Sequence, residues 1–171
     1  ISFEIRPGEK VAFVGETGSG KSTMIKLLTG LLKYEKGEIL LDGEDLRQIS
    51  LEALYKRITY LSQDTPVFDG TIKENIVFDR NVPDIEIREA LRKVELLALI
   101  DALPRGIETQ IGEKASSLSG GERQRLALSR IWFQKSDIVI FDEATSALDN
   151  LTEETVMKEV LGYLSDITVL A

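Results

Sequence analysis

One eight-residue segment constrains this chain more than any other part of its sequence. Residues 15–22 read Gly-Glu-Thr-Gly-Ser-Gly-Lys-Ser and match the pattern G-x-x-x-x-G-K-[ST] at every defined position. A strand-like stretch, 10–14, precedes the segment, and helical signals follow from 21 to about 29, with Gly30 where a C-terminal glycine belongs. A glycine-rich loop between a strand and a helix is typical of an α/β fold that binds phosphate groups.

The residue types in this loop predict the chemistry. Glycines permit positive φ, so successive N–H groups can point inward, and the following helix adds free donors and partial positive charge. Lys21 can reach the β- and γ-phosphates of ATP, and the Ser22 hydroxyl can ligate Mg²⁺. A plain Gly/Ser turn is the alternative, which the flanking strand and helix disfavour. The predicted nucleotide contacts are Gly15, Thr17, Gly18, Ser19, Gly20, Lys21, Ser22 and Thr23.

Composition narrows the functions that remain. The chain has 21 Lys and Arg against 29 Asp and Glu, a formal net charge of −8, which argues against nucleic acid as a partner. Cysteine and histidine are both absent, so thiol nucleophiles, histidine-based triads and metal sites ligated by cysteine or histidine are excluded. Apolar runs such as 138–141 are far shorter than the about 20 residues that span a bilayer, so no direct lipid insertion is expected.

Strand-like and helix-like segments alternate along the chain, which predicts a mostly parallel sheet within one domain, 1–171. Residues 1–64 and 136–171 form the expected α/β core, and the mostly helical stretch 65–135 reads as an insertion. Ser50 is the expected cap of a short helix, and capping-box spacing recurs at Thr71 and Ser119. The predicted strands are 2–5, 10–14, 37–43, 58–61, 138–141 and 167–170, and the longer predicted helices are 21–29, 86–99, 119–134 and 152–164.

Two adjacent carboxylates, Asp142 and Glu143, follow the apolar run 138–141. Sites in α/β sheets form at the carboxyl ends of strands, so we expect both acids beside the phosphate loop. Two anions next to a triphosphate would repel it unless a cation lay between them. Asp142 is therefore the predicted Mg²⁺ partner, and Glu143 is the predicted base that orients and deprotonates water. A polar strand end that starts a turn is the alternative.

A second phosphate-type site lies at 118–122, Leu-Ser-Gly-Gly-Glu, where a hydroxyl and two glycines begin a helix. Capping alone would explain Ser119 and Glu122, but it does not explain Gly120 and Gly121, which cost helix stability. One triphosphate does not need two such sites in one chain. The arrangement suggests a γ-phosphate presented by another molecule.

Together these segments resemble the nucleotide-binding domain of an ATP-binding cassette transporter of the exporter type. The motifs stand in family order over nearly the whole chain: the loop 15–22, Gln63, the signature segment 118–122, the stretch 138–143 and Ser146-Ala147-Leu148-Asp149. The signature segment is the most specific, because other phosphate-loop enzymes lack it. The resemblance implies a P-loop NTPase core with a small antiparallel β part and an inserted helical subdomain, at the cytoplasmic face of a membrane.

The resemblance also implies partners. Two such domains pair head-to-tail, so that Ser119, Gly120 and Gly121 contact the ATP held by the other domain, and Asp149 lies in the dimer-contact loop. Gln63 corresponds to a glutamine that ligates the metal and reports the γ-phosphate to the transmembrane domain, although in isolation it would read as a polar strand end. Glu143, Lys21 and Gln63 are the implied catalytic residues.

Other parts of the resemblance concern the exporter type and the ends of the chain. Residues 65–76 resemble the segment that meets the membrane domain, with Phe68 either a contact or packed locally. Residues 109–113 resemble an exporter stretch, although Ala115 stands where the family often has glycine. The family has an adenine-stacking aromatic residue and a histidine that we expect outside this chain, before residue 1 and after residue 171.

Two other functional classes of protein remain as alternatives to a transporter motor domain. A soluble ATP-dependent clamp in DNA repair or translation carries the same signature, but the stretch 65–76 and the acidic charge disfavour it. A nucleotide-binding module without hydrolysis is disfavoured by the intact Lys21, Asp142 and Glu143. We therefore expect an ATP-hydrolysing motor domain of a transporter, whose cargo the sequence does not name.

Overall fold

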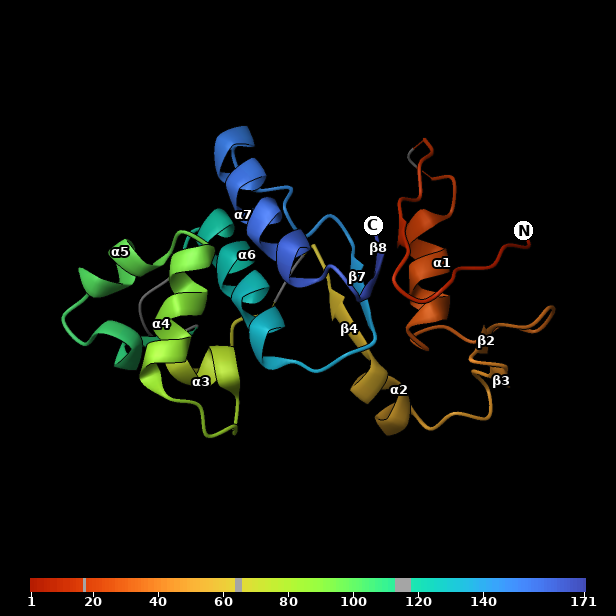
Figure 1. The fold of residues 1–171 in the computed structure, drawn as a ribbon, viewed down its shortest axis with the longest axis horizontal. Coiled ribbons are helices and arrows are strands. Elements are labelled where there is room, and N and C mark those ends of the chain that lie inside the picture. The colour runs from red at the N-terminus through yellow and green to blue at the C-terminus, as the bar shows by residue number, and fades with distance from the viewer. Residues whose placement is uncertain (17, 64–65, 113–117) are drawn as a thin grey trace. The chain divides into compact units, whose positions relative to one another are not determined.

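The computed structural model describes residues 1–16, 18–63, 66–112 and 118–171 (Figure 1). By contacts the chain divides into two compact units. The sheet unit combines residues 1–60, 135–142 and 166–171, and the helical unit combines residues 61–134 and 143–165. The assignment of residues 1–64 and 136–171 to a nucleotide-binding core remains a prediction. The contacts within the chain divide it differently, because they group residues 143–165 with the helical unit.

The sheet unit is built on a four-stranded sheet in the order β1-β8-β7-β4. The strands are β1 (Lys10–Val11), β4 (Ile58–Leu61), β7 (Ile138–Phe141) and β8 (Thr168–Leu170). Strand β8 pairs in parallel with β1 and with β7, with Val169 opposite Lys10 and Val139. The predicted mostly parallel sheet is confirmed, although β1 is shorter than the expected strand 10–14.

Two helices cover this sheet, α1 (Lys21–Leu28) and α2 (Leu51–Arg57). Their buried faces meet the strands in a core of Ile25, Leu54, Ile58, Ile140 and Leu170. Ser50 caps α2 as predicted, because its hydroxyl accepts a hydrogen bond from the Ala53 amide at 3.2 Å. Gly30 follows the end of α1 with φ of 72°, the left-handed conformation expected of a helix C-terminal glycine.

A short hairpin replaces the single strand predicted at 37–43. Strands β2 (Leu40–Leu41) and β3 (Glu44–Asp45) pair antiparallel across a turn at Asp42 and Gly43. Both turn residues have positive φ, 53° and 83°, as a tight two-residue hairpin turn requires. The predicted strand at 2–5 was also wrong, because in the structure these residues form no strand.

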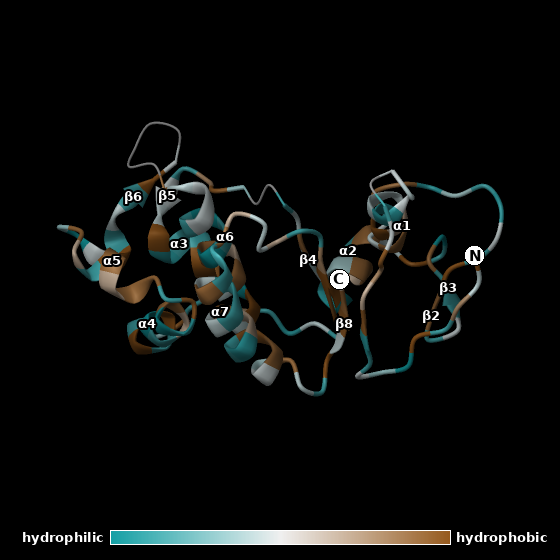
Figure 2. Cartoon of the chain, turned by 90° about the horizontal axis from the view of Figure 1, so that it is seen from above, coloured by the Kyte–Doolittle hydropathy of each residue, from teal (hydrophilic) through white to brown (hydrophobic). Residues whose placement is uncertain are grey.

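The described residues of the helical unit form five helices around an apolar interior of their own (Figures 1 and 2). Its buried side chains include Ile76, Ile87, Leu91, Leu126 and Val160. The helices are α3 (Ile72–Val77), α4 (Asp84–Lys93), α5 (Leu97–Asp101), α6 (Gly120–Ser129) and α7 (Asn150–Tyr163), with 3₁₀ turns at Gly106–Glu108 and Arg130–Phe133. A second antiparallel pair joins β5 (Gly70–Thr71) to β6 (Gln110–Ile111).

The helix predicted at 86–99 is two helices in the structure. Helix α4 ends at Lys93, and Glu95 takes a φ of 56° before α5 begins at Leu97. This turn lets Val94 and Leu96 both be fully buried, which a straight helix would not allow two residues apart. Among the described residues, no helix has the length and apolar character needed to cross a membrane.

Candidate functional site

The glycine-rich loop 15–22 leads directly into α1. Gly18 and Gly20 have φ of 84° and 96°, and a Cβ atom on either would meet nothing within 4 Å. The backbone conformation, rather than lack of space, therefore requires glycine at both positions. Gly20 stands at the N-cap of α1, no side chain caps the helix, and its first turn holds no acidic residue. Free N–H donors and the positive end of the helix dipole make this start a suitable anion site.

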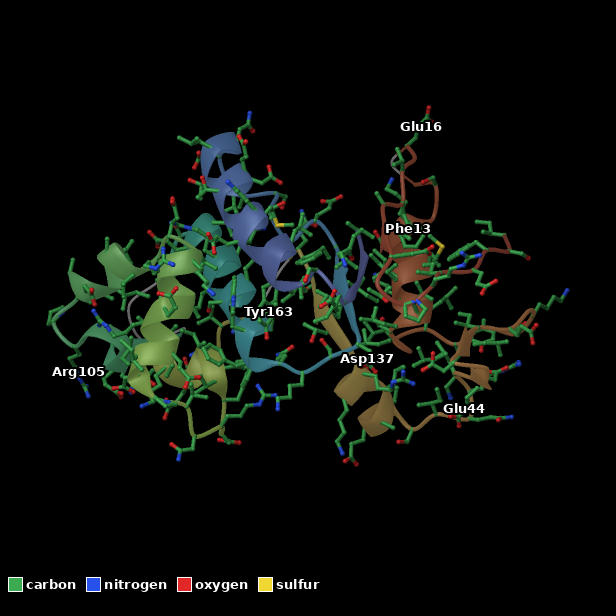
Figure 3. All side chains as sticks on the ribbon, viewed as in Figure 1. Phe13, Glu16, Glu44, Arg105, Asp137 and Tyr163 are labelled. Atoms are coloured by element: carbon green, nitrogen blue, oxygen red, sulfur yellow. The ribbon has the colours of Figure 1, made fainter. Side chains whose placement is uncertain are left out.

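Lys21 lies over this loop. Its ammonium group donates hydrogen bonds to the Gly15 carbonyl at 2.5 Å and to the Glu16 carbonyl at 3.0 Å. Ser22 and Thr23 are exposed on the first turn of α1, and the Glu16 side chain points outward from the loop tip (Figure 3). The predicted contact Thr17 lies outside the described residues. The Lys21 ammonium group therefore lies against the loop that leads into the uncapped start of α1.

Asp142 comes directly after β7 and receives a hydrogen bond that the sequence did not predict. The Tyr60 hydroxyl, on the neighbouring strand β4, donates to Oδ2 of Asp142 at 2.9 Å. Partial burial, then the hydrogen bond and charge of Asp142, raise the pKa of Tyr60 to about 12. The Tyr60 hydroxyl thus fixes the orientation of the Asp142 carboxylate at the end of β7.

A metal at this site would need donors besides protein carboxylates. Among the described residues, no group of three or more acidic side chains gathers to hold an ion. Mg²⁺ usually takes only one or two protein ligands and fills its octahedron with phosphate oxygens and water. The donor set of Ser22 and Asp142 fits such a metal, which would arrive with the nucleotide.

In the helical unit, Glu143 occupies an uncommon backbone conformation. Its φ is 52°, a value that non-glycine residues seldom adopt, and its side chain is exposed. The Ser146 amide donates to the Glu143 carbonyl at 3.1 Å and closes a turn. Thr145, in the same turn, donates to a carboxylate oxygen of Glu153 on α7 at 2.6 Å. Backbone strain of this kind concentrates at functional sites.

The signature segment forms the start of α6. Ser119 and Glu122 make the predicted capping box: the Ser119 hydroxyl accepts from the Glu122 amide, and the Glu122 carboxylate accepts from the Ser119 amide. Gly121 is needed for a close approach, because a Cβ atom there would lie 3.0 Å from the Ala147 carbonyl oxygen. Ser119 is exposed and Gly120 is half-buried, so this helix start remains open on one side.

Gln63 and Asp149 each make a hydrogen bond that gives the residue a structural role. Gln63 is exposed two residues after β4, and its carbonyl accepts a hydrogen bond from the Gln124 side chain at 3.5 Å. Asp149 caps α7 by accepting from the Thr152 amide at 3.1 Å, and hydrogen bonds from Thr152 lower the pKa of this carboxyl. The implied metal and dimer roles of these two residues stay predictions.

Phe68, in the segment 66–76, forms an aromatic surface together with Phe78. Phe68 is 51% exposed and lies edge-on to Phe78, with ring centroids 6.1 Å apart. Arg130 is buried beneath both rings, and its guanidinium donates to the carbonyls of Asn75 and Pro66. Burial lowers the pKa of Arg130 to about 10. Phe68 thus both packs locally and stays accessible, so the two alternatives for this residue are compatible.

The structure groups the predicted residues in two sets. The loop 15–22 and Asp142 belong to the sheet unit, whereas Gln63, Glu143 and the signature segment belong to the helical unit. Sequence reasoning missed four side chains that support them: Tyr60, Asn75, Gln124 and Arg130. For Asn75 and Gln124 a signal exists, since each is a polar residue on the buried face of its helix.

The chain belongs to the ABC transporter family, whose profile matches residues 1–146. It is a nucleotide-binding ATPase domain of that family, so the resemblance and the fold class predicted from the sequence are confirmed.

The curated relatives are transporters. The chain is 46% identical to the mitochondrial iron-sulfur clusters transporter ATM1 of Kluyveromyces lactis, over 97% of this chain and 23% of the relative. It is 40% identical to an ATP-dependent lipid A-core flippase of Francisella novicida, over 99% of this chain and 29% of the relative. The chain therefore spans about a quarter of the length of these relatives.

A solved structure of a bacterial Atm1-family ABC exporter with ATP bound matches the whole fold. The TM-score is 0.91 at 36% sequence identity, covering 99% of this chain and 30% of that one. The likeness supports the predicted transporter motor and gives no support to the soluble clamp.

Proposed function

We propose that this chain is the motor domain of an exporter: it binds Mg-ATP on the loop 15–22, hydrolyses it, and so drives transport through a membrane domain elsewhere in the full-length protein. The observation that supports this most strongly is the uncapped start of α1, where left-handed glycines expose backbone donors beneath the Lys21 ammonium. The ATP-bound exporter that shares this fold supports the same ligand.

Each residue of the loop has a role in this proposal. The N–H groups of residues 18–22 bind phosphate oxygens, and Lys21 exchanges its carbonyl partners for the β- and γ-phosphates. Ser22 and Asp142 are the residues that would hold Mg²⁺, with Gln63 as the further ligand that the family resemblance implies, and the ion would supply neutralisation of phosphate charge. Tyr60 orients the Asp142 carboxylate.

Glu143 is the proposed general base. Its exposed carboxylate and its turn, closed by the Ser146 amide, suit a group that orients and deprotonates water. Water attacks the γ-phosphorus, the bond to the β-γ bridging oxygen breaks, and ADP and phosphate leave. Neutral glutamine at this position would keep nucleotide binding and lose the base.

A second nucleotide-binding domain, arranged head-to-tail, completes the proposed site. The open start of α6 would contact the ATP of the partner through Ser119, Gly120 and Gly121. Because one chain offers two anion-binding helix starts for one triphosphate, a dimer accounts for both.

The proposed contact with the transmembrane domain is the aromatic surface of Phe68 and Phe78 over Arg130. Exposed large apolar side chains that lie together, as Phe68 and Phe78 do, are candidates for an interaction surface. The chain would then lie at the cytoplasmic face of a membrane. The relatives carry different cargoes by name, iron-sulfur clusters and lipid A-core, so we transfer the exporter type and not the cargo.

Two substitutions in the full-length protein test the binding and the chemistry separately. Lys21→Ala should remove most ATP affinity, while Lys26→Ala, an exposed lysine later in α1, should leave it unchanged. Glu143→Gln should keep ATP binding and lower kcat by about 10²–10⁴-fold, the usual effect of losing a general base. Glu154→Gln, exposed on α7, is its control. Unchanged ATP binding by Lys21→Ala would refute the loop assignment, and normal turnover by Glu143→Gln would refute the base.

A third measurement tests the partner domain. If two chains together form each ATP site, the ATPase rate should rise faster than linearly with protein concentration at low concentration, because the chains must first pair. Glu143→Gln should accumulate as a dimer in ATP. Strict proportionality of rate to concentration in a confirmed monomer would remove the shared-site proposal.

A further inference from the structure

One buried amide in the helical unit joins three functional segments. Gln124 lies in the second turn of α6 and is 5% exposed. Its Oε1 accepts a hydrogen bond from the Ala147 amide at 2.8 Å, and its Nε2 donates to the Ser146 hydroxyl at 3.2 Å and to the Gln63 carbonyl at 3.5 Å. Both ends of this side chain are therefore used, and no bond goes to its own helix.

The three partners of Gln124 come from distant parts of the sequence. Gln63 lies 61 residues before it, and Ser146 lies 22 residues after it. Gln63 follows β4, and Ser146 and Ala147 belong to the turn that begins at Glu143. A single side chain thus links the backbone after β4, the signature helix, and the turn that contains the proposed base.

Close packing also joins the start of α6 to the turn that follows Glu143. A Cβ atom at Gly121 would lie 3.0 Å from the Ala147 carbonyl oxygen, and one at Gly120 would lie 3.6 Å from the Ala147 Cβ. The turn 143–148 therefore rests directly on the start of α6. Ala147 is held from both directions: its carbonyl packs against Gly121, and its amide bonds to Gln124.

We propose that Gln124 is a positioning residue that couples the signature helix to the conformation of Glu143. The connection passes from Gln124 to the Ser146 hydroxyl, and from the Ser146 amide to the Glu143 carbonyl. This turn holds Glu143 in its left-handed conformation. Because a buried amide with fixed partners is rigid, a displacement of α6 moves the turn with it.

This inference rests on the proposed function, in which the signature segment contacts the ATP of the partner domain. It adds a second role for that segment, which is to position Glu143. A nucleotide that contacts Ser119 and Gly121 from outside would fix α6, and Gln124 would transmit that position to Glu143. The same amide bonds to the Gln63 carbonyl, so the glutamine predicted to sense the γ-phosphate shares the link. Occupation of the signature face then favours a competent base in the same chain.

The test uses Gln124→Met in the full-length protein, because methionine has a similar length and shape but forms no comparable hydrogen bonds. We expect kcat to fall by about 10–10²-fold, the range that small misplacement of a catalytic group produces. ATP affinity, measured with a non-hydrolysable analogue, should stay within about twofold, because the phosphate loop is unchanged. Gln48→Met, an exposed residue of the sheet unit, should leave both kcat and ATP affinity unchanged.

Two further readouts separate coupling from lost stability. The Hill coefficient for ATP should fall towards 1 in Gln124→Met, which a mere loss of folded protein would not cause. Ser146→Ala should also lower kcat, and the double variant should be no slower than the slower single variant, because both break one connection. If the two effects multiply, or if the Hill coefficient of Gln124→Met is that of wild type, the coupling is refuted.

Failure of the proposed function would look different. If the wild-type protein does not hydrolyse ATP, or if Lys21→Ala binds ATP normally, the motor assignment fails before Gln124 is tested. If wild type and Gln48→Met are active and Gln124→Met keeps normal kcat at an unchanged melting temperature, only the coupling fails. If Gln124→Met folds poorly, the test rests on Ser146→Ala. A lower kcat and a lower Hill coefficient in that variant support the coupling, and wild-type values of both refute it.

Discussion

Asn75 offers the sharpest test of how the aromatic surface of the helical unit is held. Its side chain is 2% exposed and makes three hydrogen bonds: Oδ1 accepts from the Phe68 amide at 2.8 Å, and Nδ2 donates to the Phe68 carbonyl at 2.9 Å and the Thr71 carbonyl at 3.0 Å. Asn75→Leu keeps the shape of the side chain and removes all three bonds.

The expected cost follows from the groups left behind. Each hydrogen bond has a net value of about 1 kcal/mol, and an abandoned buried donor or acceptor costs about 1–3 kcal/mol. The bonds to Phe68 are only partly buried, so water recovers part of the loss, whereas the bond to the Thr71 carbonyl is buried. We therefore expect Asn75→Leu to lower the free energy of unfolding of the helical unit by about 2–4 kcal/mol.

Urea unfolding of the chain, followed by tryptophan fluorescence, measures this loss. Trp132 is the sole tryptophan of the sequence and lies in the helical unit, so its signal reports the unit that contains Asn75. Asn81→Leu, an exposed position after α3, is the matched control and should change stability by less than about 0.5 kcal/mol. Equal midpoints for Asn75→Leu and wild type would refute the reasoning, because three such bonds would then contribute nothing.

Three further predictions concern caps, glycines and pH. Thr71→Ala should lower stability by about 1 kcal/mol in the same urea assay, because it removes the capping box of α3. Gly162→Ala, in open space on α7, should gain about 0.5–1 kcal/mol, whereas Gly121→Ala should gain nothing because of its contact with Ala147; a gain at Gly121 would contradict the close approach. The raised pKa of Tyr60 stabilises the fold below pH 10, and this contribution is lost as pH rises from 10 to about 12. Between pH 10 and 12 the free energy of unfolding should therefore fall less for Tyr60→Phe than for wild type. Parallel plots of unfolding free energy against pH for the two proteins would contradict this prediction.

Features set by local chemistry were predictable from the sequence. Ser50, Thr71 and Ser119 each cap a helix through a hydroxyl that accepts a nearby backbone N–H, and such contacts span only three residues. The loop 15–22 was predictable for the same reason, because glycines, a lysine and a helix start are adjacent in the chain. Boundaries were less certain where a strand depends on a distant partner, as with the short β1.

The errors arise where tertiary burial or a turn overrides the pattern. At Asp42 and Gly43 the dipeptide is itself a hairpin signal, so β2 and β3 could have been separated. No local signal marks Glu95, whose left-handed φ serves the burial of Val94 and Leu96. The partner of Asp142 was equally hidden, since Tyr60 lies 82 residues earlier and only the sheet order brings them together.

Asn75 and Gln124 show one physical device used twice. Each is a buried amide on a helix, and each satisfies the backbone of a neighbouring irregular segment: Phe68 and Thr71 for Asn75, and Ala147 and Gln63 for Gln124. A loop that carries functional residues cannot satisfy its N–H and C=O groups in a ladder, and an amide side chain supplies both a donor and an acceptor. A polar amide on the buried face of a helix therefore marks a loop held in place beside it, and it is at such loops that this chain keeps its aromatic surface and its proposed base.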